Sequence, residues 1–145
     1  MATINADGLL DALERYAVAK LERCGELFAN EVETNAPKRT RRLVDSIEQS
    51  TVTVYPDRVS MTVRVTATSD DGAPYPAFQN EGTGIFGPDG VPITPKKPGG
   101  VLVFDWPAAG GIVFAKSVRG TEPTRFWDKA VDAWPDIVSR VERGG

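Results

Sequence analysis

The sequence predicts an α+β fold in a single domain, with helices at both ends of the chain and antiparallel strands between them. Apolar residues recur three and four apart over residues 7–35 and 124–141, and they alternate with polar residues over 51–68. The first spacing is typical of one face of a helix and the second of a half-buried strand. A chain of 145 residues has the usual size of one domain. We therefore expect one antiparallel sheet of about four strands, with both helices packed on one of its faces.

The first helix is expected over residues 7–35. Asp7 is a suitable N-cap, and the residue before Pro37 is pushed out of the helical region, which ends the helix there. Cys24 lies on the apolar stripe, where we interpret it as a small buried apolar residue; a reactive thiol is the alternative. The stripe consists of Leu10, Leu13, Ala17, Leu21, Cys24, Phe28 and Val32.

A short second helix is expected over 40–49, capped by Thr40, because Leu43 and Ile47 are four residues apart. Residues 51–68 then read as a hairpin. A second hairpin is expected over 101–118, where two apolar runs flank a turn rich in proline and glycine.

The interval 69–100 predicts a long loop, because it holds seven glycines and six prolines in 32 residues. Loops of this length are uncommon in compact domains and are usually functional or disordered. We expect this loop to become ordered against a partner. The last helix is expected over 124–141, kinked or divided near Val131 by Pro135. Trp127 and Trp134 lie in its apolar seam, where they are either core residues or interface anchors.

The composition argues against several classes of function. The chain has no histidine and one cysteine, which excludes Ser-His-Asp triads, imidazole zinc sites and a disulfide within one chain. A net charge of −3 argues against a dedicated nucleic-acid binder, and no apolar run is long enough to span a membrane. Residues 82–87 match the glycine pattern of dinucleotide sites, but no strand precedes them and no helix follows them. We therefore expect no cofactor and no catalysis, and predict an interaction protein.

A basic cluster follows the first helix. Lys38, Arg39, Arg41 and Arg42 place four cations within five residues. Such a cluster suits contact with phosphate or with an acidic partner. The alternative is a solvated helix start, where positive charge opposes the helix dipole.

Three segments in order resemble motifs of the small neck proteins of long-tailed, siphophage-type bacteriophages. These proteins are labelled tail-completion, head–tail joining or minor tail proteins. The segments are Ala36-Pro37 with Thr40, Arg42-Leu43 and Ser46-Ile47; Tyr75 through Thr83; and Val113 through Gly120 leading to Pro123, Phe126, Trp127 and Ala130.

The resemblance implies a virion structural protein without catalysis or cofactor, located in the neck at the head–tail interface after assembly in the host cytoplasm. It implies a ring, most often a homohexamer, between the head-closing stopper and the tail terminator or tail tube protein. Genomic DNA would pass through its lumen without sequence-specific binding. The expected contact residues are Tyr75, Phe78, Glu81, Gly82, Thr83, Lys38, Arg39, Arg41, Arg42, Pro123 and Phe126.

Alternatives stay open at this stage. The chain could instead be a tail-terminator ring or a minor tail protein, a small hydrolase that uses carboxylates, or a regulatory binding module directed at the host. One departure from the family pattern also matters, because Arg41 stands where the family has glycine. Glycine permits a positive φ, so we expect a different turn at this residue.

Overall fold

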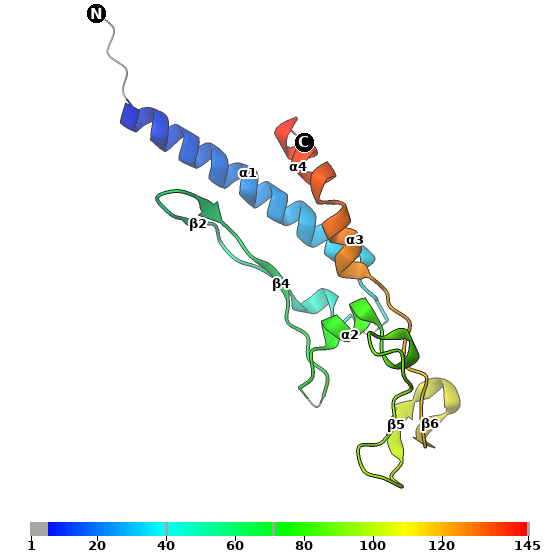
Figure 1. Cartoon of the computed structure of the whole chain (residues 1–145). Helices are drawn as coiled ribbons and strands as arrows, with labels where there is room; N and C mark the ends of the chain where they lie inside the picture. The colour runs from blue at the N-terminus through cyan, green and yellow to red at the C-terminus, as the bar shows by residue number, and fades with distance from the viewer. Residues whose placement is uncertain (1–5, 40, 71, 145) are drawn as a thin grey trace, which may run out of the picture. The chain divides into compact units, whose positions relative to one another are not determined.

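The computed structural model describes residues 6–39, 41–70 and 72–144. The chain divides into two compact units, which we call the helical unit (Met1–Ala67 with Phe126–Gly145) and the hairpin unit (Thr68–Arg125). Within the described residues it has four α-helices and small antiparallel sheets (Figure 1), which confirms the α+β class. The sequence suggested one domain, and neither compact unit was anticipated.

Helix α1 (Ala6–Asn35) is the long first helix that the sequence predicts. Asp7 lies inside its first turn rather than at the cap, where a carboxylate still favours the positive end of the helix dipole. The helix ends as expected: the Ala36 N–H donates to the Val32 carbonyl at 2.9 Å, and Pro37 follows. The buried residues of α1 all lie in its second half, so the rest of the helical unit packs there.

The prediction of a helix over 40–49 is wrong. A single 3₁₀ turn, η1 (Val44–Ser46), leads directly into strand β1 (Ile47–Gln49). Thr40, the expected cap, lies outside the described residues. Leu43 is buried as expected, but Ile47 sits half-buried on the strand. Two apolar residues four apart fit a turn followed by a strand as well as they fit a helix. Residues 47–49 form a strand because they pair with β4 (Val63–Val65).

The first hairpin is therefore longer than predicted. Near its tip, β2 (Thr53–Val54) pairs with β3 (Val59–Ser60), and the Tyr55 N–H donates to the Arg58 carbonyl at 2.8 Å. Gln49 faces Val63 and Thr53 faces Ser60, so the first strand carries one extra residue between the two ladders. Such a bulge bends the hairpin. The predicted alternation is confirmed in its second strand, where the half-buried residues are Met61, Val63, Val65 and Ala67.

The hairpin and the C-terminal helices pack on α1 (Figure 1). A Cβ at Gly25 of α1 would collide with the Met61 sulfur, so glycine permits the close approach of the strand. Phe28 meets Trp127 and Trp134 edge-on, with ring centroids 5.3 and 5.9 Å apart. Both tryptophans contribute to the packing of this unit, but neither is fully buried: Trp127 is half-buried and Trp134 is 40% exposed.

The last helix is divided as predicted, into α3 (Phe126–Asp132) and α4 (Trp134–Glu142). Pro135 lies in the first turn of α4, where its missing N–H costs no helical hydrogen bond. At the other end of α4, the Lys20 ammonium donates to the Val141 carbonyl at 2.6 Å. This bond satisfies a terminal carbonyl and places positive charge at the negative end of the dipole. Across both units the buried apolar residues are Cys24, Val32, Ala36, Leu43, Phe126, Ala130, Ile137 and Val141.

In the hairpin unit, the predicted loop over 69–100 contains regular structure. Helix α2 (Tyr75–Glu81) is followed by the 3₁₀ turn η2 (Gly84–Phe86), and Ile93 forms a β-bridge with Val118. The predicted second hairpin is confirmed as β5 (Leu102–Trp106) and β6 (Gly111–Ala115), joined through η3 (Pro107–Ala109).

The strands of the described residues form separate two-stranded ladders, β1–β4, β2–β3 and β5–β6, rather than the expected sheet of four. The β5–β6 ladder belongs to the other unit, and the bulge separates the first two. None of the described helices has a stretch long and apolar enough to cross a membrane.

The turn at Arg41 keeps the geometry that a glycine would favour, so the expectation of a different turn is wrong. Arg41 has a φ of +56°, and its carbonyl accepts the Asp45 N–H at 2.8 Å. A left-handed conformation costs a residue other than glycine roughly 1–2 kcal/mol.

We predict that the free energy of unfolding of Arg41→Gly in urea lies within about 0.5 kcal/mol of that of the natural chain. Glycine removes the cost of the left-handed conformation, and this offsets its extra chain entropy in the unfolded state. Arg41→Val should lose at least about 1 kcal/mol, because a β-branched residue suits this region least. The same substitutions at Arg42, whose φ is not positive, are the control and should not favour glycine. Equal stability of the two Arg41 variants would contradict the prediction.

Candidate assembly interface

Two segments of the hairpin unit, 82–86 and 119–123, run against each other, and we call this contact the glycine crossing. The Thr83 N–H donates to the Thr121 carbonyl at 2.9 Å, and the Ile85 N–H donates to the Arg119 carbonyl at 2.8 Å. In return, the Thr121 N–H donates to the Thr83 hydroxyl at 3.0 Å. Hydrogen bonds rather than apolar burial therefore hold these segments together.

Glycines make this approach possible. Gly84 has a φ of +64°, and a Cβ on it would overlap the Arg119 carbonyl. Gly120 has a φ of +95°, and a Cβ on it would overlap the Thr83 carbonyl. Residues 82–83 belong to the second motif of the neck-protein resemblance and 119–123 to the third, so the fold brings together parts that lie far apart in sequence.

The segment after the crossing also closes the end of α2. The Thr124 N–H and hydroxyl both donate to the Gln79 carbonyl, at 2.9 and 2.7 Å. The Arg125 N–H donates to the Asn80 carbonyl at 3.1 Å. These donors satisfy carbonyls at the helix end that have no partner within the helix. The surface of α2 is thereby held in a defined position.

The structure brings several of the predicted contact residues together around the crossing. Phe78 is 41% exposed on α2, and Glu81 and Pro123 are also exposed. Gly82 is buried, with Pro123 and the Thr121 carbonyl close to its Cα, so it acts through its backbone. Tyr75 and Thr83 are half-buried.

Phe126 needs a correction. It is 1% exposed and belongs to the core of the helical unit, so its side chain has no surface to offer to a partner in this fold. We assign it a packing role.

The basic cluster lies in the helical unit, and all four of its side chains are exposed: Lys38, Arg39, Arg41 and Arg42. The Arg41 Nε lies 3.6 Å from an Asp45 carboxylate oxygen, with both side chains largely in solvent. An exposed pair of this kind contributes little to stability. The cluster therefore places four positive charges at the surface of the helical unit.

The sequence did not single out the β5–β6 hairpin as a contact surface. Ile112 and Phe114 are 69% and 68% exposed on one of its faces, beside Val103 on the paired strand at 58%. The opposite face is also apolar, with half-buried Phe104 and Val113. A two-stranded hairpin alone is marginally stable in water. The sequence did carry a signal for this surface. In both apolar runs of 101–118, apolar residues occupy the positions of both faces of the strands, so one face had to remain uncovered.

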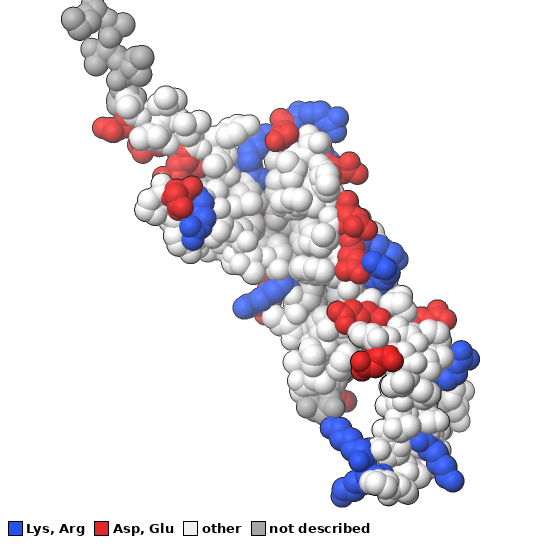
Figure 2. All heavy atoms as spheres, viewed as in Figure 1, with Lys and Arg blue, Asp and Glu red and all other residues white. Residues whose placement is uncertain are grey.

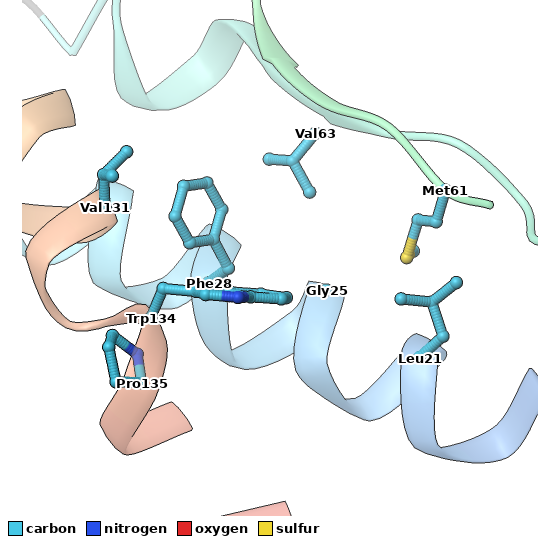
Figure 3. A pocket seen from close by; sticks show the side chains of 8 residues that line it. All are labelled: Leu21, Gly25, Phe28, Met61, Val63, Val131, Trp134 and Pro135. Carbon is cyan, nitrogen blue, oxygen red and sulfur yellow. The ribbon is translucent and has the colours of Figure 1, made fainter. Parts of the chain in front are cut away.

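The helical unit contains an apolar cleft of about 400 Å³ between α1, the second strand of its hairpin and the α3–α4 pair (Figure 3). Phe28 and Trp134 lie side by side in its wall, and Met61 and Val63 face them from the strand. Trp134 is 40% exposed and Val131 48% exposed, so the cleft is open to solvent. Its lining residues are Leu21, Gly25, Phe28, Met61, Val63, Val131, Trp134 and Pro135.

Charge is unevenly spread. The described helices α1, α3 and α4, with the two residues after α4, carry eleven acidic against six basic residues. Figure 2 shows acidic side chains along α3 and α4. Residues 87–119, around the β5–β6 hairpin, carry four basic against two acidic residues, and basic side chains gather over that end of the hairpin unit (Figure 2).

Two side chains have shifted pKa values. Burial raises the pKa of the Cys24 thiol, and Glu142 adds to this while Lys20 opposes it. The hydrogen bond and charge of Arg64, which faces Glu48 across β1–β4, lower the pKa of that carboxyl. The Cys24 shift supports a buried packing role for this cysteine.

No known protein family, curated protein or solved structure matches this chain.

We predict that Gly84→Ala destabilises the hairpin unit by at least about 2 kcal/mol more than Gly90→Ala. The two glycines have nearly the same φ, +64° and +63°, but a Cβ at Gly90 meets nothing within 4 Å. Gly90→Ala therefore isolates the conformational cost, and the difference between the variants reports the close approach. The protection of the Ile85 and Thr121 amides from hydrogen exchange measures this difference in stability. Equal protection in the two variants would contradict the role of the crossing.

We predict that Cys24 reacts with a soluble thiol reagent much more slowly in the folded than in the urea-unfolded chain. Because folding raises the pKa of this thiol, its contribution to stability is complete below the ordinary thiol pKa and is lost as pH rises through the folded value. The melting temperature should therefore fall more between about pH 7 and about pH 10 than that of Cys24→Ala. Identical pH profiles would refute the assignment.

Proposed function

We propose that this protein is a structural component of a bacteriophage head–tail connector, of the tail-completion type, which assembles as a ring in the neck of the virion. The observation that carries the proposal is the uncovered apolar surface of a single copy. The β5–β6 hairpin exposes Ile112 and Phe114, and the helical unit leaves an apolar cleft open. A chain that must bury such surfaces elsewhere is typical of an obligate assembly.

The resemblance of the three motifs adds the location. The second and third motifs meet at the glycine crossing, where Gly84, directly after the second motif, and Gly120 of the third allow close backbone contact. The contact between two of the motif segments supports the proposal that they act as one region of the protein.

The charges fit passage of DNA through such a ring. A net charge of −3 avoids the many phosphate contacts that would hold DNA in the lumen. The exposed basic cluster can dock on an acidic ring above or below, such as the head-closing stopper or the tail terminator. The residues that line the apolar cleft include no acid, base or nucleophile, which suits a packing surface rather than a catalytic one.

Electron microscopy of lysates from a phage that lacks this gene tests the proposal. We expect DNA-filled heads separated from tails of normal length. Tails of variable length would instead assign the protein as the tail terminator. Normal infectious particles would reject the structural role.

A second test uses charge reversal. Arg41→Glu with Arg42→Glu should reduce incorporation of the protein into particles several-fold, while its melting temperature changes little because both side chains are exposed. Arg58→Glu with Arg140→Glu makes the same change of charge at exposed positions away from the cluster and serves as control. Equal incorporation of both double variants would refute a docking role for the cluster.

A further inference from the structure

Two of the uncovered apolar surfaces of the described residues have complementary forms. One is a projection: Ile112 and Phe114 are the most exposed of the large apolar side chains in the described residues, and they are neighbours on one face of β6. The other is the cleft of the helical unit. Its volume of about 400 Å³ falls within the range of about 300–1,000 Å³ that is usual for sites that bury a drug-sized ligand. It has room for one aromatic and one aliphatic side chain.

We propose that Ile112 and Phe114 of one copy occupy the apolar cleft of the helical unit of the next copy. This inference rests on the proposed function, because the proposed ring is the reason to expect a second copy of the chain in the cleft. Because the projection and the cleft are different surfaces, the contact is head to tail, and repeating it generates a ring if the rotation closes.

The charges around the two surfaces favour this occupant. Four residues of the cleft wall are followed directly in sequence by an exposed acid and one by an exposed base: Leu21 by Glu22, Gly25 by Glu26, Val131 by Asp132, Pro135 by Asp136, and Val63 by Arg64. The projection carries charges of both signs with a positive sum: Asp105 pairs directly with Ile112, whereas Lys116 continues the row of Ile112 and Phe114, and Lys96 and Lys97 precede β5. Opposite charges around a central apolar contact favour this pairing.

The geometry also matches the usual anatomy of a strong contact. Buried aromatic anchors at the centre of an interface carry most of its binding energy, and polar residues surround them. Phe114 would meet the faces and edges of Phe28 and Trp134, which already form an edge-on pair in the cleft wall. The contact would cover the projection and the cleft in one step.

Disulfide trapping between two different variants tests the contact. In a Cys24→Ala chain, Phe114→Cys and Val131→Cys are made separately, at positions 68% and 48% exposed, so both should fold. Mixing the two purified chains under mild oxidation should give a cross-linked dimer, several-fold more than either chain alone. A mixture of Phe114→Cys with Val54→Cys, an equally accessible position at the tip of the first hairpin, is the control.

A chain that carries both Phe114→Cys and Val131→Cys shows whether the cleft is filled by its own hairpin or by that of another copy. We expect a ladder of covalent oligomers that ends at the size of the ring, whereas an internal disulfide in the dilute monomer would overturn the proposal. Phe114→Asp should weaken self-association measured by light scattering by about 30-fold or more, and Val91→Asp, an exposed valine outside both surfaces, should not.

The outcomes separate this inference from the proposed function. A ring that forms without cross-linking between positions 114 and 131 overturns the contact and leaves the neck assignment standing. Purified chain that stays monomeric at every concentration also overturns the self-contact. The proposed neck function is decided separately, by the particles assembled without the protein: normal particles reject it, and tails of variable length reassign the protein as the tail terminator.

Discussion

The second half of α1 is the surface on which the helical unit depends. Cys24, Gly25 and Val32 are its buried positions, and α3, α4 and the first hairpin all pack against this helix. Gly25 lets the strand that carries Met61 come close, and Phe28 holds both tryptophans of the C-terminal helices. The first turns of α1 lack such partners: Leu9, Leu10 and Leu13 are all more than half exposed. Apolar burial within one copy is thus concentrated in a short stretch, and the remaining apolar surface stays exposed.

The hairpin unit is held together in a different way. Among the described residues, the fully buried apolar side chains lie in the helical unit, whereas the glycine crossing and the end of α2 depend on backbone hydrogen bonds. Such bonds contribute modestly to net stability because water competes for the same groups. They do, however, fix direction, since each requires its own geometry. The crossing therefore gives the unit a defined shape without an apolar core, which suits a part that gains its burial by assembly.

The sequence predicted the elements whose patterns are long. The spacing over 7–35 and the alternation over 61–68 held because many residues agree, and Pro135 divided the last helix for a local steric reason. The prediction failed where a pattern rested on two residues, as with Leu43 and Ile47, or where proline content hid a helix, as at α2. Of the expected contact residues, Gly82 and Phe126 proved buried, because motif resemblance does not distinguish packing from contact. The cleft could not be predicted, since its walls come from distant segments.

In a head-to-tail contact, the number of copies in the ring depends on how the chain connects the two contact surfaces. The cleft belongs to the helical unit and the projection to the hairpin unit, and the chain passes between these units at 67–68 and at 125–126. In the proposed ring each copy repeats one rotation, so a small change at these joints would alter closure without touching either surface. Arg125, directly before the second passage, has a φ of +54°, a conformation that few residues other than glycine adopt. The donation of its N–H to the Asn80 carbonyl ties this strained residue to α2. The backbone at that joint is therefore restrained from the hairpin side by the same hydrogen bonds that close α2.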